Sequence, residues 1–146
     1  MILMKKYFVD TSIWLNLFNR EGDSTKGIPY WKLAQTFIEN TLFNNDSIYY
    51  SGSVLRELQL RLSVQEYAWA YNFIINLSNT IKLETLQIDK DLARKLESKY
   101  SFTISFYDLI HLNISKRLNM ILVTRDNELI GIARENGVIA KKPEQL

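Results

Sequence analysis

Short apolar runs rich in β-branched and aromatic residues alternate along the chain with longer segments of helical periodicity. This alternation is the feature that most constrains the fold. The runs lie at residues 7–9, 47–50, 81–88, 120–124 and 138–140. Strands separated by helices predict right-handed crossovers and a parallel sheet covered on both faces. We therefore expect an α/β fold of three layers, α/β/α, around a central, mostly parallel sheet.

Helices are expected between these runs, and several have recognisable first or last residues. Their expected ranges are 12–19, 29–44, 53–62, 65–78, 89–99, 106–118 and 127–135. Pro29 suits a first helical position and Asp89 can cap residues 90–99, whereas Asn119 and Gly137 suit helix ends. Segment 19–27 is polar and contains glycine, which predicts a mobile surface loop. With 146 residues and no recognisable linker, we expect one domain over residues 1–146.

Composition limits the chemistry that this chain can support. It has no cysteine and a single histidine, His111, which excludes disulfides and sites built from several thiolates or imidazoles. A bound metal would therefore be a hard, oxygen-ligated ion such as Mg²⁺ or Mn²⁺. The formal charge of +2 gives no overall basic field for nucleic acid, so any cationic surface must be local.

Nothing in the sequence predicts export or membrane insertion. The apolar start at residues 1–4 is followed by Lys5 and Lys6, and neither its length nor this order makes a secretory signal. No stretch approaches the ~20 apolar residues that span a bilayer. We expect a cytoplasmic protein without a membrane partner.

Four acidic residues share a sequence context that points to one edge of the predicted sheet. Asp10 directly follows the first run, and Asp126 follows the run 120–124 after one intervening residue. Glu57 lies about one turn into the helix after the second run, and Asp108 lies in the first turn of the helix that begins near Phe106. Ligands of parallel sheets bind outside the carboxyl ends of the strands, where these carboxylates would converge.

Each carboxylate also has a simpler interpretation. Asp10 and Asp126 could cap the helices that follow them, the helix dipole could favour Asp108, and Glu57 could be solvated on a helix face. Taken singly, these structural roles are the favoured interpretation. Taken together, four converging carboxylates would repel one another, raise their pKa values, and need a multivalent cation to remain ionised.

The chain resembles the PIN-domain family at four motifs in the right order and spacing. They are Val9-Asp10-Thr11-Ser12, Ser53-Val-Leu-Arg-Glu57-Leu, Ser105-Phe-Tyr-Asp108-Leu-Ile-His111-Leu and Leu122-Val-Thr-Arg-Asp126. The resemblance covers essentially the whole chain and is greatest with the small VapC-type toxin ribonucleases of toxin–antitoxin systems. Small residues such as alanine are usual in that family after the third acid, where this chain has Asn113 and Ser115. This departure concerns helix packing more than chemistry.

The resemblance implies divalent-metal-dependent hydrolysis of RNA phosphodiesters, with Mg²⁺ or Mn²⁺, to give 5′-phosphate and 3′-hydroxyl products. It implies a catalytic acidic quartet at Asp10, Glu57, Asp108 and Asp126. Because strand ends are rigid, we expect Asp10 and Asp126 to ligate the metal directly. Asp108 would ligate it directly or through water, and Glu57 would complete a second metal position or orient the attacking water.

Four other residues have expected supporting roles near this quartet. Thr11 and Thr124 are expected to hold carboxylates or metal-bound water by hydrogen bonds. His111 lies three residues after Asp108; packing or bonding to a carboxylate is the favoured interpretation over proton donation, so it is not placed in the catalytic set. Arg125 is expected to contact RNA, because it is adjacent in sequence to Asp126.

The aromatic residues of the helices predict a partner surface. The segment 67–77 is apolar almost all round, which is unusual for a helix on the outside of a small domain. We expect a groove among the helices at 12–19, 29–44 and 53–78 to receive a cognate antitoxin helix or a second copy of the chain in a homodimer. Two alternatives stay open: a non-catalytic PIN-like binding or scaffolding module, and a PIN nuclease that acts in RNA processing outside a toxin–antitoxin system.

Overall fold

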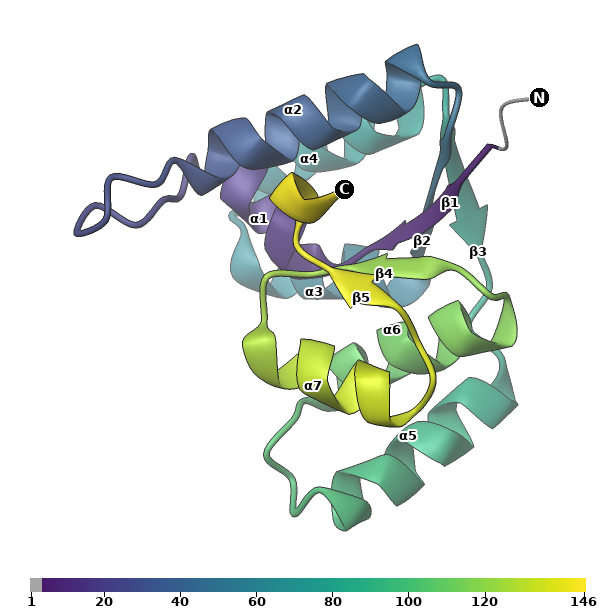
Figure 1. The fold of residues 1–146 in the computed structure, drawn as a ribbon. Helices are drawn as coiled ribbons and strands as arrows, with labels where there is room; N and C mark the ends of the chain where they lie inside the picture. The colour runs from purple at the N-terminus through teal and green to yellow at the C-terminus, as the bar shows by residue number, and fades with distance from the viewer. Residues whose placement is uncertain (1–3) are drawn as a thin grey trace.

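A five-stranded sheet forms the centre of the protein, seen here in a computed structural model that describes residues 4–146 (Figure 1). Its strands run in the order β3-β2-β1-β4-β5, and every neighbouring pair is parallel. They are β1 Lys6–Val9, β2 Ser47–Ser51, β3 Thr80–Leu83, β4 Ile121–Val123 and β5 Ala140–Lys141. This confirms the predicted parallel α/β sheet, although the third strand ends at Leu83 rather than extending to residue 88. Residues 1–3 of the apolar start lie outside the described residues.

Helices cover both faces of the sheet. They are α1 Thr11–Phe18, α2 Tyr30–Phe43, α3 Gly52–Arg61, α4 Val64–Asn76, α5 Gln87–Lys99, α6 Phe106–Arg117 and α7 Asn127–Glu135, followed by the short 3₁₀ helix η1 Pro143–Gln145. In Figure 1, α1, α2 and α4 lie on one side of the sheet, and α5, α6 and α7 on the other. Within residues 4–146, no helix has the length and apolar character needed to cross a membrane.

The core is centred on β1 and β4. Phe8, Val9, Leu122 and Val123 are fully buried, and Phe8 is paired with Leu122 across the two strands. Strands that are buried on both faces read as continuous apolar runs, which is why these segments are recognisable in the sequence. The central position of β1 places its carboxyl end, and Asp10 after it, in the middle of the sheet edge.

Helix α6 is buried along most of its length, and its two unusual polar residues are satisfied inside the core. Asn113 donates a hydrogen bond from Nδ2 to the carbonyl of Asp89 at 2.9 Å, and Ser115 donates from Oγ to the carbonyl of His111 at 2.8 Å. Because buried polar groups with partners carry little penalty, these side chains replace small residues without disturbing the helix.

Of the four residues that the sequence suggested as helix starts or ends, Asn119 and Gly137 are confirmed, whereas Pro29 and Asp89 are not at the predicted positions. Asn119 and Gly137 adopt positive φ angles of 53° and 77° just after α6 and α7, as helix-ending residues do. Pro29 precedes the first residue of its helix by one position. Asp89 does not cap residues 90–99: α5 begins earlier, at Gln87, and the Asp89 carboxylate reaches back to accept a hydrogen bond from the Leu86 amide at 2.9 Å.

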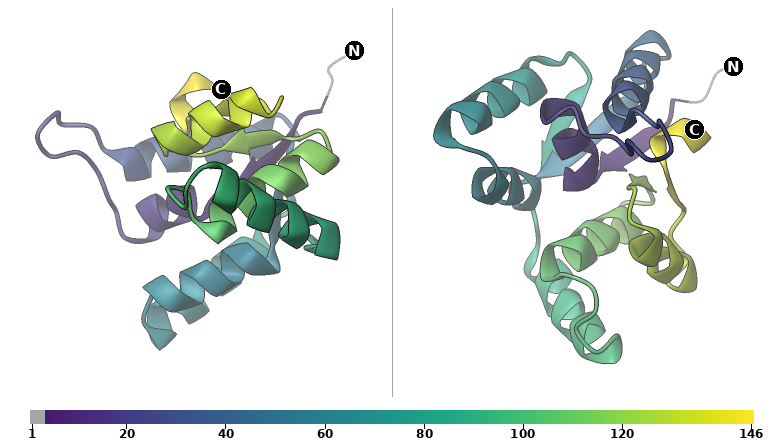
Figure 2. Two further views of the ribbon diagram at one scale, coloured as in Figure 1. Left: turned by 90° about the horizontal axis from the view of Figure 1, so that it is seen from below. Right: turned by 90° about the vertical axis from the view of Figure 1, so that its left-hand side faces the viewer.

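The segment between α1 and α2 projects from the body of the protein as a long loop (Figures 1 and 2). An isolated antiparallel bridge between Asp23 and Ile28 closes it. At Gly22, a Cβ atom would lie 2.6 Å from the carbonyl oxygen of Ile28, so this close approach of two backbones requires glycine.

Candidate active site

The candidate site lies where the strand order reverses, at the carboxyl ends of β1 and β4. Chain connections leave β1 and β4 toward opposite sides of the sheet at such a point, which opens a crevice between them. The right-hand panel of Figure 2 looks toward this edge. A cavity of about 430 Å³ lies here, and its walls include all four predicted acids: Asp10, Glu57, Asp108 and Asp126.

Asp10 is the most highly coordinated of these carboxylates, and it is almost fully buried. Its Oδ2 accepts hydrogen bonds from Ser12 Oγ at 2.7 Å and from Thr124 Oγ1 at 2.9 Å. Its Oδ1 lies 2.8 Å from Nδ1 of His111. Although Asp10 occupies the residue before α1, its side chain makes no capping hydrogen bond. The carboxylate is therefore held by the side chains of Ser12 on α1, His111 on α6 and Thr124 just after β4, and it does not cap the backbone of α1.

His111 connects Asp10 to Glu57. The imidazole is fully buried, and its Nε2 lies 3.4 Å from Glu57 Oε1, too far for a good hydrogen bond. The same Glu57 oxygen accepts a hydrogen bond from Thr11 Oγ1 at 2.7 Å. Of the hydroxyls expected to hold carboxylates, Thr11 thus contacts Glu57 and Thr124 contacts Asp10.

Asp108 and Asp126 are the other two carboxylates, and only Asp108 lies in close contact range of Asp10 and Glu57. One ligand atom each from Asp10, Glu57, Asp108 and His111 can be chosen so that all lie within 4.8 Å of one another. Asp126 lies outside this group but borders the same cavity. Its Oδ1 accepts hydrogen bonds from the amides of Glu128 at 2.9 Å and Leu129 at 3.3 Å, so it also caps α7.

The carboxylates of the cluster differ in their electrostatics. Burial, together with the charges of Asp10, Glu57 and Asp126, raises the pKa of Asp108 to about 7 against the opposing charge of His111. Burial also raises the pKa of Glu57, and this outweighs the opposing effects of His111 and Thr11. Like charges and a partly dry environment both oppose ionisation of these two groups.

Asp10 behaves in the opposite way. Burial alone would raise its pKa, but the hydrogen bond and charge of His111, with the hydroxyls of Ser12 and Thr124, lower it below the ordinary value. Burial would lower the pKa of His111, but the hydrogen bond and charge of Asp10 raise it. The sequence-based expectation that every carboxylate of the cluster has a raised pKa is therefore wrong for Asp10.

The donor set suits a hard divalent cation. Three carboxylates gather within reach of one ion, and the fourth is beside them. Oxygen ligands of this kind are those that Mg²⁺ and Mn²⁺ prefer. A bound cation would offset both the burial and the like charges that raise the Asp108 pKa. His111 Nε2 has no hydrogen-bond partner among the described residues, so one buried polar atom also faces this group unsatisfied.

Arg125 does not line the cavity, although it is adjacent to Asp126 in sequence. Its guanidinium makes two hydrogen bonds to the Glu144 carboxylate, at 2.8 and 2.9 Å, and lies over the ring of Tyr30. Successive side chains at a strand end point in different directions, so adjacency to Asp126 does not bring Arg125 to the same side. In this arrangement its charge is paired with Glu144 rather than presented to a ligand.

Three residues of the site were not singled out by the sequence analysis. Ser12 donates to Asp10, while Arg61 and Tyr107 line the cavity. The spacing of Arg61, four residues after Glu57 on a helix, could have identified it, because residues i and i+4 share a face. Tyr107 directly precedes Asp108, but nothing in the sequence indicated which way its ring points.

Structural comparison gives high similarity to toxins and toxin–antitoxin complexes. The chain is similar to the toxin VapC20 of Mycobacterium tuberculosis, described as cleaving the sarcin–ricin loop, with 17% identity, a TM-score of 0.65, and coverage of 86% of this chain and 94% of that one. It is similar to VapBC2 of Rickettsia felis, bound to a promoter DNA fragment, with 20% identity, a TM-score of 0.63, and coverage of 94% of this chain and 98% of that one. It is also similar to a toxin–antitoxin complex of Klebsiella pneumoniae, with 16% identity, a TM-score of 0.65, and coverage of 94% of this chain and 97% of that one. At these identities the likeness establishes a shared fold.

Sequence comparison identifies the family. No relative is found among curated protein sequences. A family model described as PIN domain, however, matches residues 7–135, which include the four cavity carboxylates and the strands and helices that position them. The chain therefore belongs to the PIN-domain family.

Proposed function

We propose that this protein is a divalent-metal-dependent endoribonuclease and the toxin of a VapBC-type pair. The observation that carries the proposal is the convergence of Asp10, Glu57 and Asp108, beside Asp126, in one open cavity. A cluster with such a raised Asp108 pKa is costly to a fold that has no cation to bind. The alternative of four separate caps and surface charges does not explain why these side chains share one cavity.

The contacts of each residue indicate the role that it would have in the reaction. Asp10, Glu57, Asp108 and Asp126 would hold Mg²⁺ or Mn²⁺, which when bound lowers the pKa of water and offsets charge on the phosphate oxygens. Asp10 is fixed by Thr124, Ser12 and His111, so it provides the most rigid oxygen pair. Glu57 has one oxygen engaged by Thr11, which leaves its other oxygen free to accept a proton or orient water.

Cleavage assays with Asn variants test this proposal. We expect Asp10→Asn and Asp126→Asn to lose cleavage of a 5′-labelled oligoribonucleotide in Mn²⁺, because the amide keeps the shape but not the charge. Asn remains a good helix cap, so Asp126→Asn should fold as well as the wild type. Asp91→Asn, an exposed carboxylate on α5, is the matched control and should cleave normally.

Two results would count against the nuclease proposal. Undiminished cleavage by Asp10→Asn and Asp126→Asn would mean that the activity does not use this cavity. Binding of RNA by the wild type without any cleavage in Mn²⁺ or Mg²⁺ would favour the scaffolding alternative. A DNA oligonucleotide of the same sequence shows whether the preference is for RNA.

The toxin role rests on a second feature, an apolar groove formed by α1, α2 and α4. Its volume is about 410 Å³, and its walls include Phe18, Trp31, Ile38, Leu42, Phe73 and Leu77. We propose that a helix of a cognate antitoxin docks there, as amphipathic helices do in apolar grooves. The large exposed side chains Trp69 and Val64 on α4 further suggest a homodimer.

Expression in a bacterial host and light scattering test these partner proposals. We expect the wild type to arrest growth, and Asp126→Asn not to, because toxicity depends on cleavage. The purified chain should elute as a dimer or with a small protein encoded beside it. Normal growth with the wild type expressed, together with a monomer at micromolar concentration, would leave the nuclease proposal standing and refute the toxin role.

A further inference from the structure

The walls of the acidic cavity hold one cation. Among the described lining residues, Arg61 at the end of α3 is the only lysine or arginine. Its side chain makes no hydrogen bond or ion pair within residues 4–146. Arg61 lies four residues after Glu57 on α3, so the two side chains share a helix face, and both line the cavity. An arginine without a partner beside an acidic cluster is available to an anionic ligand.

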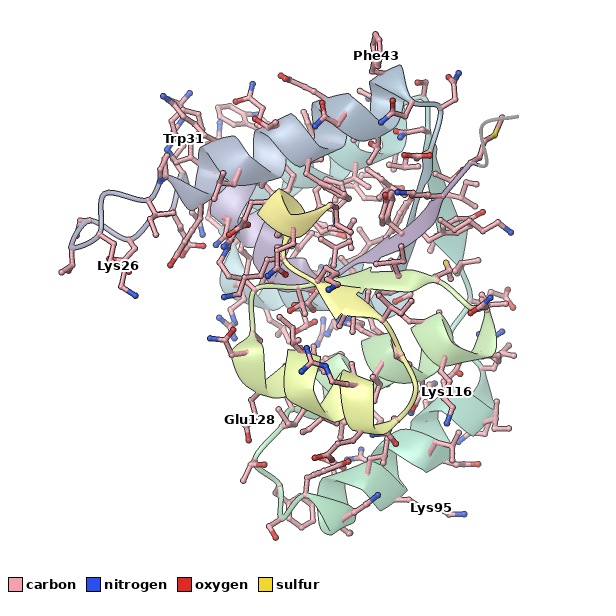
Figure 3. The ribbon with its side chains drawn as sticks, viewed as in Figure 1. Lys26, Trp31, Phe43, Lys95, Lys116 and Glu128 are labelled. Atoms are coloured by element: carbon pink, nitrogen blue, oxygen red, sulfur yellow. The ribbon has the colours of Figure 1, made fainter. Side chains whose placement is uncertain are left out.

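Arg125, which the sequence suggested for RNA contact, and three other cations of the chain are placed differently. Arg125 is paired with Glu144, and Arg117 with the buried carboxylate of Asp89. Lys26 lies at the tip of the projecting loop and Lys116 near the end of α6, each on the outer surface (Figure 3). None of these four side chains lines the cavity, whereas Arg61 does.

An aromatic ring also lines the cavity. Tyr107, in the first turn of α6, borders it beside Asp108, and its hydroxyl makes no hydrogen bond within the described residues. Phe106, the residue before it, is covered by the guanidinium of Arg94 at 3.8 Å. Tyr107 is thus the ring on this helix turn that a ligand in the cavity can contact.

We propose that Arg61 and Tyr107 bind single-stranded RNA in this cavity, Arg61 through a backbone phosphate and Tyr107 by stacking on an unpaired base. This inference rests on the proposed nuclease function and names its substrate contacts. Phosphates supply affinity without sequence preference, and aromatic rings stack on bases that have left a duplex. A paired base is stacked on its neighbours and could not reach Tyr107, so the inference excludes intact duplex as the preferred ligand.

Binding of a fluorescein-labelled, mixed-sequence ten-nucleotide RNA, measured by anisotropy in Mn²⁺, tests the inference. All chains carry Asp126→Asn, so that the RNA stays intact. We expect Arg61→Gln to weaken binding roughly tenfold, as for other hydrogen bonds to charged groups. The dependence of log K on log salt concentration should become shallower by about 0.7, the value for one phosphate contact on a single strand. Arg56→Gln is the matched control, because Arg56 lies on the same helix, is exposed, and does not line the cavity.

Tyr107 is tested in the same assay. Tyr107→Ala should weaken binding roughly tenfold, as expected for one lost base stack, without changing the salt dependence. Tyr107→Phe keeps the ring and should bind like the parent chain. The same RNA annealed to its complement should bind less tightly to the parent, and Tyr107→Ala should not weaken that binding further.

The outcomes separate this inference from the proposed function. Equal losses for Arg61→Gln and Arg56→Gln would refute a specific phosphate contact, as would parental binding by Arg61→Gln at every salt concentration. If Arg61→Gln also lost the thermal stabilisation by Mn²⁺, then Arg61 would act on the acidic cluster, and the inference would fail. RNA binding that depends on Arg61 and Tyr107 in a wild type that cleaves nothing would support the inference and refute the nuclease proposal.

Discussion

Replacing Asp108 by Asn should raise the stability of the metal-free protein at pH 8. Burial, together with the charges of Asp10, Glu57 and Asp126, raises the pKa of Asp108 to about 7. The carboxylate that forms above this pH is crowded by like charges, whereas Asn has the same shape and no charge. The variant therefore removes repulsion without opening a cavity.

The magnitude follows from the size of this shift. Each pKa unit corresponds to about 1.4 kcal/mol, so a rise from 3.8 to about 7 represents up to about 4 kcal/mol of unfolding free energy. Asp108 is only partly buried, and screening by solvent reduces the expected gain to about 2 kcal/mol. For a domain of this length, that gain raises the melting temperature by roughly 5 °C.

The pH dependence has a definite sign. Because the folded-state pKa lies above the unfolded value, the contribution of Asp108 to stability is fully present below pH 3.8 and is lost as pH rises through about 7. Wild-type protein should therefore become less stable between pH 5 and pH 8. The stability of Asp108→Asn should fall less than that of the wild type, so its advantage in unfolding free energy should grow across that range.

Thermal and urea unfolding in EDTA at pH 5 and pH 8 measure this difference. Asp10→Asn is the matched comparison, because the pKa of Asp10 is lowered and its charge is stabilised by His111, Ser12 and Thr124. That variant should lose about 1 to 3 kcal/mol, since buried hydrogen-bond partners are left unsatisfied. If Asp108→Asn were no more stable than the wild type at pH 8, or if its advantage did not grow from pH 5, the electrostatic reasoning would be wrong.

Three further predictions concern the cluster and the core. A divalent cation that binds only the folded state should stabilise the wild type by about 2.7 kcal/mol when its concentration is a hundred times its dissociation constant. A melting temperature that does not change in millimolar Mn²⁺ or Mg²⁺ would argue against a metal site. His111→Leu should cost roughly 2 kcal/mol by removing the buried partner of Asp10, and His111→Asn, which keeps a donor, should cost less in urea unfolding. Arg117→Met should lower the free energy of unfolding by about 3 kcal/mol, because it leaves the almost fully buried Asp89 carboxylate without its ion-pair partner. Adding Asp89→Asn should recover part of this loss, and additive losses would refute an interaction between the two residues.

The sequence by itself determined the architecture and the location of the candidate site. Buried parallel strands must be apolar throughout, so the segments around Phe8 and Leu122 are recognisable without any tertiary information. Helix ends depend on local backbone conformation, and Asn119 and Gly137 indicated theirs correctly. The acids that directly follow strands could be placed at one edge of the sheet from the sequence, because the carboxyl ends of parallel strands share an edge.

Only the tertiary structure decided what each side chain in that site does. The sheet order places β1 beside β4, and this brings Thr124 to Asp10 across 114 positions of sequence. The packing of α6 against α3 likewise brings His111 between Asp10 and Glu57. Long-range packing also fixes the dielectric and the neighbours of each carboxylate, so that the Asp10 pKa is lowered while the Asp108 pKa is raised. The spacing of residues along the chain predicts neither the burial of a carboxylate nor the charges around it.

The two arginines show the same limit most clearly. Arg125 is next to Asp126 in the sequence, yet its guanidinium is paired with Glu144 near the C-terminus. Arg61 was not singled out in the sequence, although its spacing of four residues from Glu57 was available, yet it lines the cavity. Which way a long side chain points depends on the partners that the fold brings within its reach, and those partners lie on segments that are distant in sequence. Local pattern therefore located the carboxylates, and packing determined which cation stands beside them.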